Sequence, residues 1–133
     1  MIYVLDTDTC IYFLNGNYPS IGDEIASRSL EDLAITAISV AELYFGAYHS
    51  ARKTKNIDVL DKLFEKIQIL PFDNRSAKHF GELKETLHRE GKMLGPYDLL
   101  IASIVHSQRH TLVTHNVKEF SLVKGLLVVD WVR

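Results

Sequence analysis

Short apolar runs alternate along the chain with longer segments in which apolar residues recur at helical spacing. The runs, rich in β-branched and aromatic residues, predict buried strands at residues 2–5, 33–36, 67–72, 111–114 and 126–129. Helices are predicted at 9–14, 19–28, 40–50, 74–90 and 96–109, with a further one capped by Thr54 or Asn56. This alternation predicts an α/β fold, a central parallel sheet of four to five strands with helices on both faces.

The length of 133 residues suits one domain, and no repeat, low-complexity segment or linker divides it. We therefore expect a single domain over residues 1–133. No apolar run is long enough to span a bilayer, and no signal peptide is visible at the N-terminus. Cys10 is the only cysteine, which excludes an internal disulfide and suits a reducing compartment. These features predict a cytoplasmic protein with no membrane association, in which Cys10 is a buried packing residue.

The net charge of −2 gives no electrostatic indication of nucleic-acid binding, because dedicated DNA-binding proteins usually carry a basic excess. Contact with RNA would have to use local basic patches, of which Arg52, Lys53 and Lys55 form the densest. The alternative for this patch is a solvated turn between helices. His106 and His110 have the spacing of a metal-binding pair, but without a third ligand we expect both to be solvated.

Acidic and amide side chains follow several of the predicted strands. Asp6 and Asp8 come directly after the first strand, and Glu42 lies in the first turn of the helix after the second. Asp98 lies in the first turn of the helix at 96–109, and Asn116 follows the fourth strand. Ligands of parallel sheets bind outside the carboxyl ends of the strands, so these side chains are expected to converge at one edge.

Each acid also has a structural interpretation. Glu42 stands at capping-box spacing from Ser39, Asp98 could complement a helix dipole, and Asp8 could be an N-cap. Capping alone does not explain why the acids would share one edge. Hard oxygen ligands without His or Cys favour Mg²⁺ or Mn²⁺, and a cation held there can support in-line phosphoryl displacement. This chemistry belongs to metal-dependent nucleases and phosphatases.

The segment LDTDT at residues 5–9 resembles the first motif of haloacid-dehalogenase-like phosphatases. In that family Asp6 would attack phosphate and Asp8 would act as acid and base. The family also requires a lysine and a later acidic pair after a strand, and this chain shows no such pair. It also lacks obvious room for a cap domain, so the phosphatase remains the alternative interpretation.

Four longer blocks resemble, in order, those of PIN-domain ribonucleases, best of all the VapC toxins of bacterial and archaeal toxin–antitoxin pairs. They are YVLDTDTCIYFL, TAISVAELYFGA, GPYDLLIAS and LVTHNVKEFSLVKGL, and the resemblance extends through VVDW over almost the whole chain. It implies catalytic roles for Asp6, Glu42, Asp98 and Asn116, with Asp6 and Asp98 holding Mg²⁺ or Mn²⁺. Asn116 stands where Asp is common in the family, and Asp8 where Asn is common.

The same resemblance implies Mg²⁺-dependent endonucleolytic cleavage of RNA, often transfer RNA, restrained by a small VapB-like antitoxin. It also implies a homodimer. We expect the C-terminal segment of the antitoxin to lie against the helices around Tyr44 and Tyr48 and to place an Arg or Lys at the acidic edge. An inactive PIN-like binding module is a further alternative. It would require loss of Asp6, Glu42 or Asp98, and none is lost.

Overall fold

A computed structural model describes all 133 residues and contains one five-stranded sheet. Its strands are β1 (Tyr3–Leu5), β2 (Leu33–Thr36), β3 (Gln68–Leu70), β4 (Thr111–Val113) and β5 (Leu127–Val129). Every neighbouring pair is parallel, and the strand order is β3-β2-β1-β4-β5. The predicted parallel α/β sheet is therefore confirmed, with five strands.

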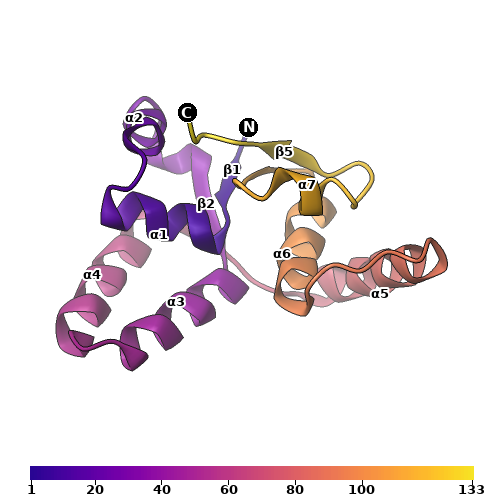
Figure 1. Ribbon diagram of the computed structural model, residues 1–133, viewed down its shortest axis with the longest axis horizontal. Coiled ribbons are helices and arrows are strands. Elements are labelled where there is room, and N and C mark those ends of the chain that lie inside the picture. Colours follow the sequence, from indigo (N-terminus) through magenta and orange to yellow (C-terminus); the bar gives the residue numbers. More distant parts are fainter.

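Helices connect the strands and cover both faces of the sheet (Figure 1). The N-terminal helices are α1 (Thr7–Asn15), α2 (Pro19–Ala26), α3 (Ala37–His49) and α4 (Lys53–Lys66), and a 3-10 turn at Leu30–Asp32 leads into β2. The later helices are α5 (Asn74–Arg89), α6 (Pro96–Ser107) and the short α7 (Val117–Phe120). No helix combines the length and the apolar character needed to cross a membrane.

Two apolar clusters form the core, one on each face of the sheet. Successive strand residues point to opposite faces, so Val4 packs with the cluster that holds α5 and α6 residues, and Leu5 packs with that of α1 to α4. Cys10 is fully buried in the second cluster, which confirms its predicted packing role. A sheet covered on both faces needs strands that are apolar throughout, and all four residues of β2 are buried.

Several helix boundaries differ from those that the sequence predicts. The N-cap of α1 is Asp6, whose side chain accepts a hydrogen bond from Thr9 N, so the helix begins at Thr7 and Asp8 is not the cap. Helix α4 begins at Lys53, upstream of both predicted caps, and its N-cap residue makes no side-chain bond. The four-residue α7 was not predicted, because one turn is too short to show helical periodicity.

The chain order places a switch point at β1. Strands β2 and β3 extend the sheet on one side of β1, and β4 and β5 extend it on the other. Connections therefore leave the carboxyl end of β1 and of β4 in opposite directions, which is where open α/β sheets form their ligand sites. Asp6 follows β1 directly, and the segment that contains Asn116 follows β4.

Candidate active site

Asp6 is fixed by its position between β1 and α1. Its backbone N donates to Val113 O at 3.0 Å, and its Oδ1 accepts from Thr9 N at 2.8 Å. The residue is only 5% exposed, and burial raises the pKa of its carboxyl group, while hydrogen bonds from Thr114 and Thr9 oppose that shift. The same carboxylate thus caps a helix and faces the acidic edge, so capping and a functional role coincide here.

Glu42 lies in the second turn of α3, because the helix begins at Ala37 and not at Val40 as predicted. The cap of α3 is Thr36, whose side chain accepts from Ser39 N, so Glu42 forms no capping box with Ser39. Instead Thr7 Oγ1 donates to Glu42 Oε1 at 2.6 Å and lies 2.9 Å from Ser39 Oγ. This bond joins the start of α1 to α3 and orients Glu42 toward the Asp6 side of the sheet edge.

Asp98 lies in the first turn of α6, as predicted, and is half-buried. The pKa of its carboxyl group is raised to about 6. Burial is the largest cause, and repulsion from Asp6, Glu42, Glu119 and Asp8 adds to the rise. Repulsion of this kind falls with distance, and Glu42 and Asp8 also line one cavity, so these carboxylates share one edge of the sheet. The convergence predicted for Asp6, Glu42 and Asp98 is therefore present.

Asn116 lies at the N-terminus of α7, directly after β4. Its backbone N donates to Thr114 Oγ1 at 3.0 Å, and its side-chain Nδ2 donates to Glu119 Oε2 at 2.9 Å. The amide nitrogen is thereby engaged, and the carbonyl oxygen remains as the acceptor of this side chain. Glu119 is a member of the acidic edge that the sequence analysis missed, because residues 117–120 were not recognised as helical.

The site as a whole carries several carboxylates without a basic partner. None of the ion pairs in the structure involves Asp6, Asp8, Glu42, Asp98 or Glu119. Clustered carboxylates of this kind are stabilised by a cation, and oxygen-only donors suit Mg²⁺ or Mn²⁺. No three His, Cys, Asp or Glu side chains lie in positions to hold a metal ion together. Mg²⁺ commonly takes one or two carboxylates and keeps several waters, so an open site of this type fits it.

Asp8 is exposed beside this cluster and lines a cavity of ≈590 Å³. The cavity reaches from the acidic edge to two exposed aromatic residues, Phe45 and Tyr97, which are 70% and 59% exposed. Asp8 therefore lies at the mouth of the site. Its charge raises the pKa of both Asp6 and Asp98, but in each case it is the smallest of the causes.

Comparison with known proteins agrees with this arrangement. Residues 3–126 match the PIN domain family. The chain is 35% identical to Ribonuclease VapC2 of Rickettsia felis over 98% of each chain. It is 32% identical to the tRNA(fMet)-specific endonuclease VapC of Salmonella typhimurium over 97% of each chain. The crystal structure of Rickettsia felis VapBC2 bound to a promoter DNA fragment has a TM-score of 0.91 and 34% identity, covering 98% of this chain and 99% of that chain.

The fold and its acidic edge are thus those of a PIN domain, a class of α/β nucleases. The chain belongs to the PIN-domain family and, within it, to the VapC ribonucleases. The family accounts for LDTDT without the phosphatase interpretation. All three acids that an inactive binding module would have to lose are present at the site.

Proposed function

We propose that this protein is a Mg²⁺-dependent endoribonuclease that cleaves transfer RNA in the cytoplasm and acts as the toxin of a toxin–antitoxin pair. The observation that carries the proposal is the convergence of Asp6, Glu42 and Asp98, from three distant segments, at the switch point of the sheet. The match to a tRNA(fMet)-specific endonuclease supports transfer RNA as the substrate class.

In this proposal Asp6 and Asp98 hold the metal, because they are the two acids whose pKa values burial raises and which a cation would stabilise. A divalent cation there supplies charge neutralisation and an activated water for in-line displacement at phosphorus. Glu42, held by Thr7, completes the acidic edge and accepts hydrogen bonds. Asn116 uses its carbonyl oxygen to orient water, while Glu119 holds its amide nitrogen.

Digestion of purified total transfer RNA with Mg²⁺, mapped by end sequencing, tests the proposed activity. The expected result is cleavage at one or a few defined positions by the wild-type protein. The Asp6→Asn protein serves as the control, since it removes one charge from the metal site. Intact transfer RNA after prolonged incubation with wild type would contradict the proposed substrate.

Asn116→Ala is expected to reduce the cleavage rate by about 10- to 100-fold, as for residues that orient metal ligands. Asn116→Asp is expected to reduce it less. Alanine removes the oxygen acceptor, whereas aspartate keeps an oxygen in the same place. Cleavage rates of the two variants at saturating Mg²⁺ provide the measurement. Equal losses in both variants would argue that the amide nitrogen and its bond to Glu119 matter instead.

Asp8→Asn is expected to lower the rate by less than about tenfold, because solvent screens the charge of an exposed carboxylate. The neutral amide keeps the size of the side chain, and Asp8 caps no helix. Initial rates on the same RNA measure the effect. An inactive Asp8→Asn protein would reopen the assignment of Asp8 as an acid–base residue, as in the phosphatase interpretation.

The antitoxin is proposed to occupy a groove of ≈480 Å³ between α1, α3 and α4 that has Glu42 at its rim. A neighbouring apolar cavity of ≈330 Å³ shares Val59 with the groove, so the two form one path along α4. A helical or extended segment lying there could place an Arg against Glu42. The antitoxin was predicted to lie against the helix that carries Tyr44 and Tyr48. This helix, α3, forms one wall of the groove, but the two tyrosine side chains do not line it. Tyr44 donates to Asp61, and Tyr48 is exposed.

Co-expression with the neighbouring small reading frame tests this placement. Wild type alone is expected to arrest growth, and the co-expressed antitoxin to restore growth and co-purify with the toxin as an assembly of homodimers. Val59→Asp, in the groove, is expected to abolish co-purification, whereas Met93→Asp, an 88% exposed apolar residue elsewhere, is the control. Co-purification with both variants would show that the groove is not the binding surface. Light scattering of the purified protein measures its mass and so tests whether it is a dimer.

A further inference from the structure

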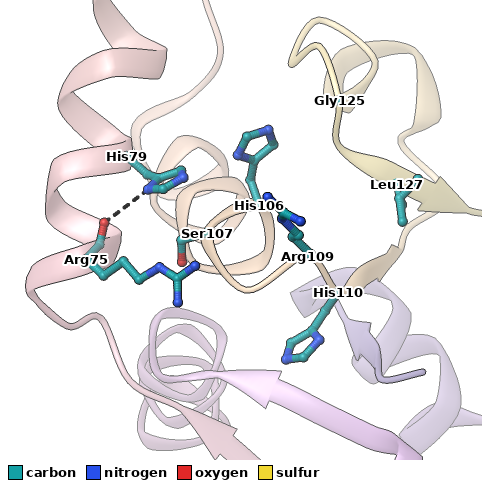
Figure 2. A pocket seen from close by; sticks show the side chains of 8 residues that line it. All are labelled: Arg75, His79, His106, Ser107, Arg109, His110, Gly125 and Leu127. Carbon is teal, nitrogen blue, oxygen red and sulfur yellow. Dashed lines mark hydrogen bonds between the residues drawn. The ribbon is translucent and has the colours of Figure 1, made fainter.

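A further cavity, of ≈400 Å³, lies at the C-terminal end of α6, whereas Asp98 lies near its N-terminal end. Figure 2 shows the residues that line this cavity. Asp98 is in the first turn of α6 and Ser107 ends the helix, so the helical rise separates the two regions by about 13 Å along the axis. The cavity is lined by Arg75, His79, His106, Ser107, Arg109, His110, Gly125 and Leu127. It thus collects two arginines and three histidines and no acidic residue, in contrast to the active site.

Neither arginine forms an ion pair, and the acid that acts on Arg75 is the N-cap residue Asp73. The arginines that form ion pairs are Arg28, Arg89 and Arg133, and neither Arg75 nor Arg109 is among them. Figure 2 shows the Arg75 side chain extending from α5 toward α6, the helix that Arg109 follows. A guanidinium group is permanently charged and offers a planar set of donors that matches phosphate oxygens. These two groups are therefore available to an anion from outside.

Local interactions favour the arginines only in part. Arg75 lies in the first turn of α5, where the positive end of the helix disfavours a cation, and the N-cap carboxylate of Asp73 offsets this effect. Arg109 is the only non-glycine residue with positive φ, at 57°, a conformation that is unfavourable for a residue with a Cβ. The negative end of α6 favours a positive charge near Arg109, but glycine would suit this backbone better.

The histidines complete the lining with ring nitrogens. His79 Nδ1 donates to the Arg75 carbonyl oxygen at 3.3 Å, so Nε2 of the neutral ring is an acceptor. The His79 and His106 rings lie 5.5 Å apart, and His106 Nδ1 is buried with no hydrogen-bond partner. Burial, followed by the N-terminal ammonium group, lowers the pKa of His110. The two arginines are permanently charged.

A metal ion does not suit this cavity, since two arginines repel a cation and no three of the lining histidines form a metal-binding group. Gly125 closes one side with φ 82°, and a Cβ there would meet His106 Nε2 at 3.3 Å, so the backbone approaches the ring closely. The cavity volume is within the range of small-ligand pockets. The lining therefore favours a small oxyanion with several acceptor atoms.

We propose that this cavity binds a phosphate group through Arg75 and Arg109, with His106 as an additional donor. The phosphate is contributed either by the backbone of RNA bound at the active site or by a free phosphate-bearing ligand. Only the RNA source rests on the proposed ribonuclease function. Phosphate binding itself can be measured without any cleavage, so the two proposals fail separately.

Titration with inorganic phosphate at constant ionic strength, followed by the imidazole proton signals in NMR, tests the site. The chain has six histidines, few enough for individual signals to be assigned. His79 and His106 signals of wild type are expected to shift to saturation. The double variant Arg75→Gln/Arg109→Gly is expected to bind at least tenfold more weakly. It should remain folded, because glutamine relieves the helix dipole and glycine suits the backbone at Arg109.

The control double variant is Lys62→Gln/Arg89→Gln. It removes the same number of positive charges from exposed residues that pair with acids one turn away. This control is expected to bind phosphate as wild type does. Absence of a saturable shift in wild type, or equal shifts in wild type and the Arg75/Arg109 variant, would overturn the proposal.

Transfer RNA binding by the same proteins, each carrying Asp6→Asn and kept in EDTA to prevent cleavage, identifies the source of the phosphate. If RNA supplies it, the slope of log K against log salt is expected to fall by about one to two in the Arg75/Arg109 variant alone, by counterion release. If a free ligand supplies it, the slope stays unchanged while phosphate titration still separates the variants. Either result supports the site and assigns its ligand.

Discussion

Asp98→Asn is expected to abolish RNA cleavage, by about 1,000-fold or more, while leaving the chain folded. The amide keeps the shape of the side chain but removes the charge that would hold the metal. Asp98 is repelled by four other acids, so the neutral variant should be more stable than wild type in the absence of metal. We expect a gain of about 1 kcal/mol at neutral pH, after allowance for solvent screening of a half-exposed group.

The stability of wild type should also depend on pH in a way that this variant removes. The pKa of Asp98 is about 6 in the folded chain, against an ordinary value of 3.8. Between these values the folded chain binds a proton that the unfolded chain does not, so the free energy of unfolding should fall as pH rises from about 4 to about 7. Urea unfolding of both proteins in EDTA measures this slope.

The matched control is Asp58→Asn, the same chemical change at an exposed carboxylate that pairs with Lys62 on α4. It should retain wild-type cleavage and the wild-type dependence of stability on pH. Loss of folded structure in Asp98→Asn at ordinary temperature would instead support a purely structural role for this acid in the first turn of α6.

Removal of metal is expected to have an effect as large as loss of Asp98. Cleavage should stop in EDTA and return with Mg²⁺ or Mn²⁺ but not with Ca²⁺, which prefers longer bonds and a looser geometry. Mg²⁺ should also raise the melting temperature of wild type, because a ligand that binds only the folded chain stabilises it. Asp98→Asn should lose most of that increase.

The melting experiment separates metal binding from catalysis. A rise with Mg²⁺ in wild type and in Asp58→Asn, but not in Asp6→Asn or Asp98→Asn, would place the metal at these two acids. Full cleavage in the presence of chelator would contradict the metal mechanism. Equal stabilisation of all four proteins would place the metal elsewhere on the chain.

The fold was largely predictable because its signals are local. The strands are short, mostly apolar runs, of which β2 and β4 are buried throughout, and each long helix has a periodic apolar face. Sequence alone therefore predicted the sheet and six helices. The missing helix, α7, spans Val117–Phe120 and is too short to carry a period. Its absence from the prediction concealed Glu119, which reaches the site only because one helical turn brings it back to Asn116.

The acids of the site were predictable because they follow strand ends, but their local partners were not. The sequence offered Asp8 as the cap of α1, whereas Asp6 takes that role, and Thr7 donates a hydrogen bond to Glu42. Such choices depend on how α1 packs against α3, which no local pattern encodes. The capping interpretation of Glu42 failed for the same reason, since α3 begins three residues earlier than predicted.

The basic cavity shows the same limit. The densest basic segment in the sequence, which contains Arg52, Lys53 and Lys55, is exposed at the start of α4. Arg75 and Arg109 are far apart in sequence and line the same cavity because α5 and α6 pack together. His106 and His110 were expected to be solvated, and that prediction was wrong, as both are half-buried in this cavity.

The central claim is that Asp6, Glu42 and Asp98 act as one catalytic unit. Cleavage rates of Asp6→Asn, Glu42→Gln, Asp98→Asn and the triple variant on one defined RNA test it most directly. Residues that act as a unit have non-additive effects, so each single variant should lose about as much activity as the triple variant. Single variants that each retain substantial activity, with losses that multiply in the triple variant, would contradict a shared site.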